Sequence, residues 1–332
     1  MAFEGKVMVT GGAGYIGSHA VLALCDAGYD VVVVDNLVTG FAWAVDPRAT
    51  LVEANVADDI AVRAAIRDHN VRAIMHFAGS VVVPESVSDP LKYYRNNTAA
   101  TRSLIESAVT EGVPHFIFSS TAATYGTPVR VPVEETDPTV PINPYGMSKL
   151  MSEAMLRDVA AAHPINYCAL RYFNVAGADP QGRSGQSTVG ATHLIKIAVE
   201  AATGKREAVS VFGTDFDTPD GTGVRDYIHV SDLAAAHVAA LDLLVAEPTK
   251  SHTLNAGYNR GFSVNEVLDA VDRVTNMTIA RRYEGRRAGD PAALVADNRA
   301  ILAALPWRPQ RDDLDGIVRD ALAWERRLSE RA

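Results

Sequence analysis

Two side chains that could move a proton stand four positions apart in the sequence. Tyr145 and Lys149 lie in a stretch predicted to be helical from about Pro144 to Ala162, and their spacing places both on one face of the helix. A phenol with its ordinary pKa of about 10 is a poor base at neutral pH, but a neighbouring ammonium group favours the phenolate. Tyr145 could then take a proton from a substrate hydroxyl while hydride leaves the same carbon atom.

A hydroxyl group that could hold the same substrate oxygen follows a predicted strand. The strand runs from Val113 to Ser119, and Ser120 and Thr121 come directly after it. In a doubly wound sheet, ligands bind outside the carboxyl ends of the strands. A Tyr–Lys pair alone is more often an accident of a helix surface. Together with this strand end and the motif described next, it predicts a catalytic site made of Thr121, Tyr145 and Lys149.

An acceptor for the hydride is indicated near the start of the chain. The stretch TGGAGYIGSH, from Thr10 to His19, follows the apolar run Lys6–Val9 and precedes an apolar helical segment. This strand–turn–helix context is what a dinucleotide-binding fingerprint needs. Without a Cβ, Gly11 allows a tight turn, Gly14 lets a pyrophosphate approach the backbone, and Gly17 lets the helix pack close to its strand. The free N–H groups at the helix start then face the phosphates.

Asp35 completes this motif eighteen residues after Gly17, at the end of the apolar strand Tyr29–Asp35. A carboxylate at this position accepts hydrogen bonds from both ribose hydroxyls of the adenosine. It would repel a 2′-phosphate, and the next residues, Asn36 and Leu37, supply no cation. The sequence therefore predicts NAD rather than NADP as the cofactor.

These motifs belong to a regular alternation of strands and helices. Further strands are predicted at Thr50–Glu53, Ala73–Phe77 and Ile165–Tyr172, and further helices from Asp58 or Asp59 to about Asn70 and from Val87 to Gly112, the latter with a candidate break near Pro90. Such an alternation predicts an α/β fold with a doubly wound parallel sheet of the Rossmann type.

Beyond Asn174 the pattern changes. Residues Gly177–Gly190 are rich in glycine, serine and polar side chains and predict a long surface loop, and the later helices and strands alternate less regularly. Long loops in compact domains are usually functional. We expect a cofactor-binding domain over residues 1–175, with later segments returning to it, and a smaller α/β substrate-binding domain over residues 176–332.

Composition argues against several classes of function. No apolar run reaches the roughly 18 residues of a membrane span, and the first strand begins close to Met1, so neither a span nor a signal peptide is expected. A net charge of −9 argues against nucleic acid as a partner.

Cys25 and Cys168 lie in apolar segments, which favours inert thiols in the reducing cytoplasm. No catalytic metal is expected, because the histidines are scattered without ligand spacing; they include His76, His193, His229 and His252.

The order of several motifs resembles one family along nearly the whole chain, from Lys6 to Trp324. Besides the fingerprint, these motifs are VVDN, HFAG, FSSTAATYG, NPYGMSK, RYFNVAGA and DGTGVRDYIHVSDLA. They stand in the order found in the extended short-chain dehydrogenase/reductase family, in its NAD-dependent epimerase/dehydratase branch. The segment Asp220–Val230 is the most specific of them, and with it the chain resembles the UDP-glucose 4-epimerases of that branch.

The resemblance implies roles for individual residues. Tyr145 matches the catalytic tyrosine, Lys149 the catalytic lysine, and Thr121 stands where many members have serine. The positions that match NAD-binding residues are Gly11, Gly14, Tyr15, Ile16, Gly17, Asp35, Asn36, Leu37, Thr39, Gly40, Asn55, Val56, Phe77, Ala78, Gly79, Val81, Asn96, Tyr145, Lys149 and Phe173. The positions that match nucleotide-sugar-binding residues are Thr121, Tyr145, Asn174, Phe212, Arg225, Arg287 and Asp290. Many members have a lysine where this chain has Val81.

The reaction that the resemblance implies is a transient oxidation. The sugar 4-hydroxyl loses its proton to Tyr145 and the C4 hydride goes to NAD⁺; the flat 4-keto sugar turns over with its UDP anchored, and the hydride returns to the other face. UDP-glucose and UDP-galactose are thereby interconverted. Leu294 stands where some epimerases have a bulky tyrosine, and the smaller side chain predicts room for the N-acetyl group of UDP-GlcNAc. The family usually forms a homodimer through the Tyr145 helix and the long helix before it.

Other activities stay open at this point. Uronate and pentose forms of the UDP-sugar are alternative substrates. A nucleotide-sugar 4,6-dehydratase is a less favoured alternative, because that family places an Asp-Glu pair directly after the threonine and Ala122-Ala123 stand there. A non-catalytic NAD-binding protein would typically lack the Tyr–Lys pair, which this chain keeps.

Overall fold

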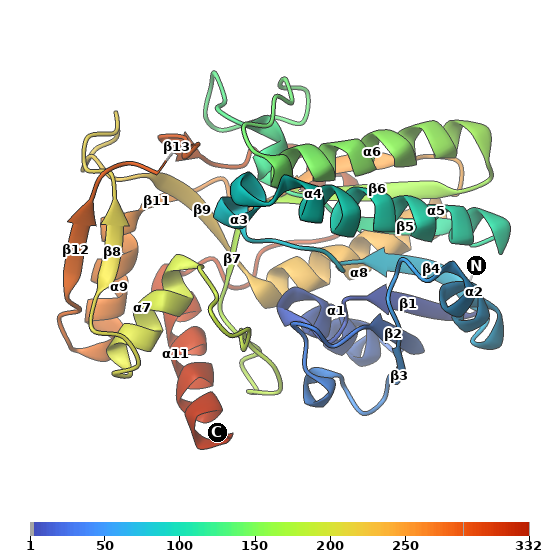
Figure 1. The fold of residues 1–332 in the computed structure, drawn as a ribbon, viewed down its shortest axis with the longest axis horizontal. Coiled ribbons are helices and arrows are strands. Elements are labelled where there is room, and N and C mark those ends of the chain that lie inside the picture. The colour runs from blue at the N-terminus through green and yellow to red at the C-terminus, as the bar shows by residue number, and fades with distance from the viewer. Residues whose placement is uncertain (1–2, 288, 332) are drawn as a thin grey trace.

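A computed structural model describes residues 3–287 and 289–331. The larger part of the molecule is built on a seven-stranded parallel sheet with helices on both faces (Figure 1). The strand order across the sheet is β10-β6-β5-β4-β1-β2-β3. These strands span Lys6–Thr10 (β1), Val31–Asp35 (β2), Thr50–Glu53 (β3), Val71–His76 (β4), His115–Ser119 (β5), Asn166–Tyr172 (β6) and His252–Ala256 (β10).

Two apolar layers flank the sheet, because successive side chains of a strand point to opposite faces. Val7 and Val9 of β1 pack into one layer, and Met8 between them packs into the other. The first layer includes α1 and α8 and the second includes α2, α5 and α6; the helices span Tyr15–Asp26 (α1), Asp59–Asp68 (α2), Ala100–Thr110 (α5), Pro144–Ala162 (α6) and Val230–Ala246 (α8). This arrangement confirms the predicted doubly wound α/β sheet.

The region predicted as a long helix from Val87 to Gly112, with a candidate break near Pro90, is divided there and contains a π-helix further on. Its pieces span Val83–Ser88 (α3), Pro90–Tyr93 (α4), Tyr94–Ala99 (a π-helix, η2) and α5. The first break comes at Pro90, which has no N–H and disfavours helical backbone in the residue before it. That residue, Asp89, accepts a backbone N–H at 3.2 Å with its side chain and so begins the next piece. π-helical turns are frequent at functional sites, and this one carries Asn96 and Asn97.

The smaller part of the molecule lies on the left in Figure 1 and contains two short sheets. In the first, β9 pairs with β7, β11 and β13; in the second, β8 pairs with β12. The elements after β6 span Asn174–Ala176 (β7), Leu194–Ala202 (α7), Val209–Phe212 (β8), Val224–His229 (β9), Gly261–Ser263 (β11), Val264–Thr275 (α9), Arg281–Glu284 (β12), Ala293–Leu294 (β13), Arg299–Ala304 (α10) and Leu314–Arg331 (α11). Residues 177–193 contain neither helix nor extended strand, as predicted for the surface loop. Within the described ranges, no helix has the length and apolar character of a membrane span.

Three buried histidines should make the stability of the fold depend on pH. Burial lowers the pKa of His76 to about 3 and the pKa values of His19 and His237 to about 4, below the ordinary value of about 6.5. Between these values the unfolded chain binds protons that the folded chain does not, so stability falls as the pH falls from about 6.5 towards 4. Each histidine contributes up to about 1.4 kcal/mol per pH unit. Urea unfolding at pH 7, 6 and 5 measures this slope.

A substitution at His237 checks the origin of the slope. Its Nε2 is buried and has no hydrogen-bond partner in the described part of the chain, so His237→Leu removes a titrating group without breaking a bond at that atom. The variant should lose less stability than the parent between pH 6.5 and 5. An unchanged slope would contradict the assignment.

Candidate active site

The start of α6 places Tyr145 beside the turn that follows β5. Asn143 caps the helix, because its side chain accepts the Gly146 N–H at 2.9 Å. A Cβ on Gly146 would lie 2.5 Å from a carbonyl oxygen of the turn η3 (Ala122–Tyr125), so glycine allows the close contact. Tyr145 is thereby buried next to Thr121, which precedes η3. The structure brings these two predicted residues into hydrogen-bond contact.

The charges around this phenol decide whether it can act as a base. Burial raises the pKa of Tyr145, and the hydrogen bond with the Thr121 side chain lowers it in part. Burial also lowers the pKa of Lys149 to about 8, and the Glu153 carboxylate opposes that shift. Lys149 is therefore mainly an ammonium group at neutral pH. A phenolate in this buried position needs such positive charge, because desolvation alone favours the neutral phenol.

Lys149 is held between a strand end and the loop after β4. Its Nζ donates to the carbonyl oxygen of Ser119 at 2.9 Å. A Cβ on Gly79 would lie 4.0 Å from the same Nζ, so this predicted cofactor residue borders the ammonium group. Asn97, on the π-helix, fixes the loop by accepting the Ser80 N–H at 2.7 Å. The predicted Tyr–Lys helix, the strand end and the HFAG loop therefore meet at one place.

The structure also contains a buried ion pair near Lys149 that was not predicted from the sequence. Glu153, one helical turn further along α6, accepts hydrogen bonds from Arg171 on β6 at 2.6 and 3.0 Å. The Ser120 hydroxyl donates to Glu153, and Arg171 donates to the Tyr125 hydroxyl at 3.0 Å. Glu153 and Arg171 are each only 7% exposed. The spacing of four between Lys149 and Glu153 is the one signal in the sequence that could have pointed to this pair.

The fingerprint glycines form a turn that side chains would obstruct. Gly11 has φ of +72°, and a Cβ there would lie 2.6 Å from the backbone nitrogen of Ala78. A Cβ on Gly17 would lie 2.1 Å from the Gly11 carbonyl oxygen, so α1 touches the turn directly. Gly14 precedes α1 and caps it with no side chain. No side chain at Gly14 covers the first backbone N–H groups of α1. These N–H groups can therefore donate hydrogen bonds to the phosphates of NAD.

Asp35 lies at the end of β2 and is buried. One of its oxygens accepts the Ala13 N–H at 3.0 Å, and the other accepts the Leu37 N–H at 2.8 Å. Leu37 has φ of +55°, so the chain turns back around the carboxylate. Each carboxylate oxygen has a further lone pair for a ribose hydroxyl, and the geometry fits the adenosine of NAD.

The other predicted cofactor residues lie at the same edge of the sheet, in the loops that follow it, at the start of α1 or on the π-helix η2. The Asn55 side chain accepts the Ala57 N–H at 2.9 Å, and Asn96 donates to the Ser80 hydroxyl at 3.1 Å. Val81 is 51% exposed, so it contributes little to a closed pocket. The remaining positions of this group, after β1, β2, β3, β4 and β6, are Tyr15, Ile16, Asn36, Thr39, Gly40, Val56, Phe77, Ala78 and Phe173.

The predicted substrate residues come from the smaller part of the molecule. Arg225 on β9 has its Nη2 3.8 Å from a carboxylate oxygen of Asp290. The Arg287 guanidinium lies over the Phe212 ring, 3.5 Å from the ring centroid. Asn174 is paired along β7 with the residue two positions after Arg225. The structure therefore joins these residues as two small groups, each from segments distant in the sequence.

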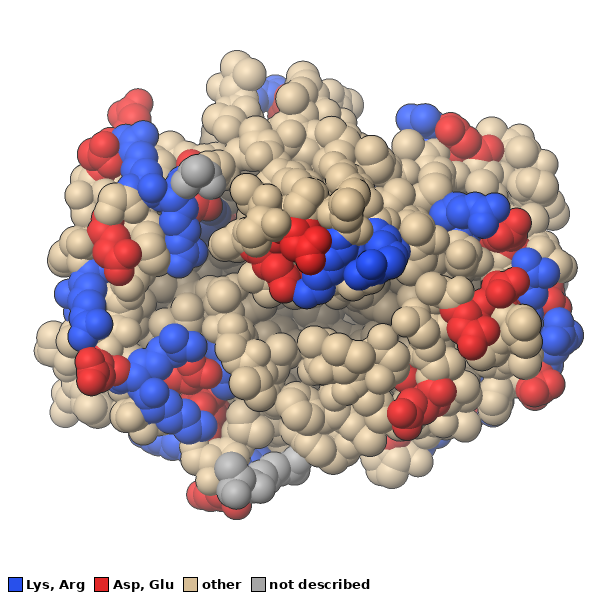
Figure 2. Space-filling view, viewed as in Figure 1, with Lys and Arg blue, Asp and Glu red and all other residues tan. Residues whose placement is uncertain are grey.

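The two halves of the site meet at Leu294. In β13 this residue is paired with Arg225, and it packs in one apolar cluster with Ala122 and Phe173. The space-filling view shows the surface hollowed near the middle of this face, with basic side chains on the left rim of the hollow (Figure 2). In the described ranges, no group of three or more His, Cys, Asp or Glu side chains is arranged to hold a metal ion.

Comparisons with known proteins agree with this geometry. Residues 7–257 match the model of the NAD dependent epimerase/dehydratase family. The chain is 54% identical to a UDP-glucose 4-epimerase of Azospirillum brasilense over 98% of this chain and 93% of the relative. It superposes on a UDP-glucose 4-epimerase from Brucella ovis in complex with NAD with a TM-score of 0.93 and 43% identity, over 96% of this chain and 98% of the other. A UDP-Glc/GlcNAc 4-epimerase from Campylobacter jejuni gives a TM-score of 0.85 and 46% identity, over 97% and 99%. From the family match, the identities and the shared cofactor fold, the chain belongs to the NAD dependent epimerase/dehydratase family.

Proposed function

We propose that this protein interconverts UDP-glucose and UDP-galactose by transient oxidation at C4 of the sugar, with NAD as the bound coenzyme. The observation that carries the proposal is the meeting of Thr121, Tyr145 and Lys149 beside a fingerprint turn shaped for NAD. The relatives named as UDP-glucose 4-epimerases support the choice of sugar.

The catalytic roles follow from the contacts of these side chains. Bound NAD⁺ supplies an acceptor for the C4 hydride and later gives it back. Tyr145 accepts the proton of the 4-hydroxyl as the hydride leaves, and returns it to the oxygen when the hydride comes back. The Thr121 hydroxyl holds the same oxygen, and the Lys149 ammonium group stabilises the phenolate.

Inversion at C4 requires a firm hold on the nucleotide and a loose hold on the sugar. Guanidinium groups bind diphosphate oxygens strongly, and Arg225 and Arg287 are the candidates for that contact. Phe212, under Arg287, offers an apolar face for the uracil. With the UDP held at its phosphates, the flat 4-keto sugar can present either face to Tyr145.

Conversion of UDP-galactose deuterated at C4 tests the proposal. The expected product is UDP-glucose that keeps the deuterium at C4, with no net formation of NADH. A 4-keto-6-deoxy product would identify a dehydratase, and bound NAD without any turnover would identify a binding protein. A panel that includes UDP-uronates and UDP-pentoses then determines the substrate range.

Leu294 is proposed to admit N-acetylated sugars as well. It packs in one apolar cluster with Phe173 and with Ala122, the residue after Thr121, and the Campylobacter jejuni relative is named for both sugars. Leu294→Tyr should lower turnover of UDP-GlcNAc by about tenfold or more, because the larger ring fills the space for the acetyl group. Turnover of UDP-galactose should change far less. Leu294→Met, of similar volume, is the matched control, and an equal loss on both substrates in Leu294→Tyr would contradict the assignment.

We also propose that the protein is a cytoplasmic homodimer. On the helical layer of α4 and α6, Leu91 is 76% exposed and Met151 is 41% exposed, which suits burial against a second copy. Cys25 and Cys168 are both free thiols, in keeping with a reducing compartment. Sedimentation of the purified protein, with Met151→Glu as the disrupting variant, tests the assembly.

A further inference from the structure

The loop of residues 178–188, here called the strap, crosses the start of α1 on its way from β7 to α7. A small pocket that opens to solvent lies at this crossing. Its walls come from the fingerprint, from the loop after β2 and from the strap, and they include Gly14, Tyr15, Thr39, Phe41, Gly185, Ser187 and Thr188. Three of these residues, Gly14, Tyr15 and Thr39, are predicted from the sequence to hold NAD. The strap therefore forms the remaining wall of the place where the coenzyme diphosphate is expected.

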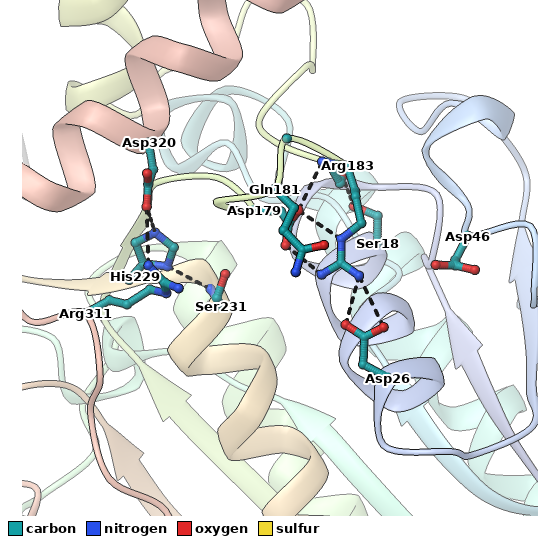
Figure 3. A network of polar contacts seen from close by, with 12 residues as sticks. Ser18, Asp26, Asp46, Asp179, Gln181, Arg183, His229, Ser231, Arg311 and Asp320 are labelled. Atoms are coloured by element: carbon teal, nitrogen blue, oxygen red, sulfur yellow. Dashed lines mark hydrogen bonds and ion pairs between the residues drawn. The ribbon is translucent and has the colours of Figure 1, made fainter.

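Arg183 anchors the strap to the far end of α1. Its guanidinium group donates to Asp26 at 2.9 and 3.2 Å and to Asp179, within the strap, at 2.8 and 3.0 Å (Figure 3). Asp26 also accepts a hydrogen bond from a second arginine, Arg48, at 2.7 Å. Arg183 therefore joins the strap to the end of α1, whereas Arg48 pairs with the same aspartate from the loop after β2.

A second anchor on α1 is buried. The hydroxyl groups of Ser184 and Ser18 lie 2.7 Å apart and are hydrogen-bonded, and both side chains are almost fully buried. Ser18 belongs to the first turn of α1, directly after the fingerprint glycines. The strap therefore lies against the helix end that would bind the phosphates, rather than above the surface.

The strap is also fastened to α11. A Cβ on Gly185 would lie 2.3 Å from the Trp324 ring, so the backbone lies flat on the indole. The Trp324 Nε1 donates to the Ser187 hydroxyl at 3.1 Å. Trp43 stacks on Trp324 with ring centroids 6.2 Å apart, and Phe41 stacks on Trp43 at 5.1 Å. The strap and Phe41 of the loop after β2 therefore line the pocket, and both are connected to Trp324 of α11 behind it.

We propose that the strap is a retaining segment for the coenzyme: bound NAD leaves only when the contacts of Arg183 and Ser184 with α1 break and the strap lifts. The physical reason is steric, because the pocket at the diphosphate site is bounded by the strap and by side chains that the strap holds. The inference rests on the proposed binding of NAD but is independent of the sugar that the enzyme converts. It assigns to residues 178–188 a role that their composition alone left open.

The release rate of NAD from the holoenzyme tests this role. Protein loaded with labelled NAD is diluted into an excess of unlabelled NAD, and the retained label is followed by filtration. Arg183→Ala should release NAD about tenfold faster, since it removes charged hydrogen bonds that hold the strap to α1. Arg48→Ala is the matched control, because it removes a guanidinium group from the same Asp26 but not from the strap. Release from Arg183→Ala that is no faster than release from the parent protein would overturn the proposal.

A reversible lock gives an independent measurement. The two serine hydroxyls lie 2.7 Å apart, so the double variant Ser18→Cys, Ser184→Cys is designed to form a disulfide there, and a thiol assay verifies that it has formed. After loading with NAD and oxidation, release should be about tenfold slower than in the same protein after reduction, because opening of the strap is blocked. The two single cysteine variants show whether the thiols alone change the rate.

The outcomes separate this inference from the proposed function. A parent protein that takes up no NAD would overturn both. A holoenzyme that epimerises UDP-galactose but releases NAD equally fast with the lock closed or open would overturn the strap alone. Faster release in Arg183→Ala together with slower release in the oxidised double variant supports it.

Discussion

Replacing Tyr145 by phenylalanine should lower the rate of UDP-galactose conversion about 10³-fold. The substitution removes only the phenolic oxygen, which is the atom proposed to exchange the proton of the 4-hydroxyl, and general acid–base catalysis of this kind contributes about 10²- to 10⁴-fold. The ring remains in place on α6, so NAD and UDP should bind as in the parent. The measurements are the turnover number and, separately, the affinity for UDP by calorimetry.

Tyr93→Phe is the matched control for this result. The Tyr93 ring is buried and packs edge-on against Tyr145 with centroids 6.4 Å apart, but its hydroxyl donates to the carbonyl oxygen of Val82 and to Glu85, away from Thr121. The control loses a buried hydroxyl of the same kind and should keep most of the activity. If both variants lost activity equally, Tyr145 would have a packing role rather than a catalytic one.

Arg171→Met should lower the free energy of unfolding by about 3–5 kcal/mol, the usual cost of leaving a buried partner charge uncompensated. Glu153 would then keep its Ser120 hydrogen bond but lose both bonds from the guanidinium group. Urea unfolding at pH 7 measures the change. Because Glu153 also opposes the lowering of the pKa of Lys149, the variant should alter the pH dependence of catalysis as well.

Two further proteins separate charge burial from the loss of a large side chain. The double variant Arg171→Met, Glu153→Gln should be more stable than Arg171→Met alone, since it leaves no unpaired buried carboxylate. Arg67→Met breaks an arginine–glutamate pair at 2.8 Å whose arginine is 58% exposed, and should cost about 1 kcal/mol or less. Equal losses in the single and double variants would contradict the proposed electrostatic role.

Several features were predictable because they depend on residues close together in the chain. The strand, glycine turn and helix of the fingerprint lie within about two dozen residues, and the positive φ of the turn at Gly11 favours glycine there. Tyr145 and Lys149 share a face of α6 whatever packs around them. The predicted helix Pro144–Ala162 is found with those bounds, because the Asn143 cap and a long run without a breaker define it locally.

Other features depend on contacts between segments that are far apart in the chain, and the sequence of a single segment does not specify them. The short segment His252–Ala256 joins the sheet beside β6 although the intervening chain builds much of the smaller part, and five residues of mixed polarity do not reveal that pairing. The break expected near Pro90 is found, but the π-helix Tyr94–Ala99 that follows it was not predicted.

By itself, the sequence determined the doubly wound sheet, the NAD fingerprint with Asp35 and the Tyr145–Lys149 pair, since each depends on periodicity or on spacing within one element. Only the tertiary structure decided that Glu153 pairs with Arg171, that Leu294 shares an apolar cluster with Ala122, and that residues 178–188 are fastened to both α1 and α11. These contacts join segments far apart in the chain. Burial selects them, because a charge or a hydroxyl removed from water must find whichever partner the packing brings within reach.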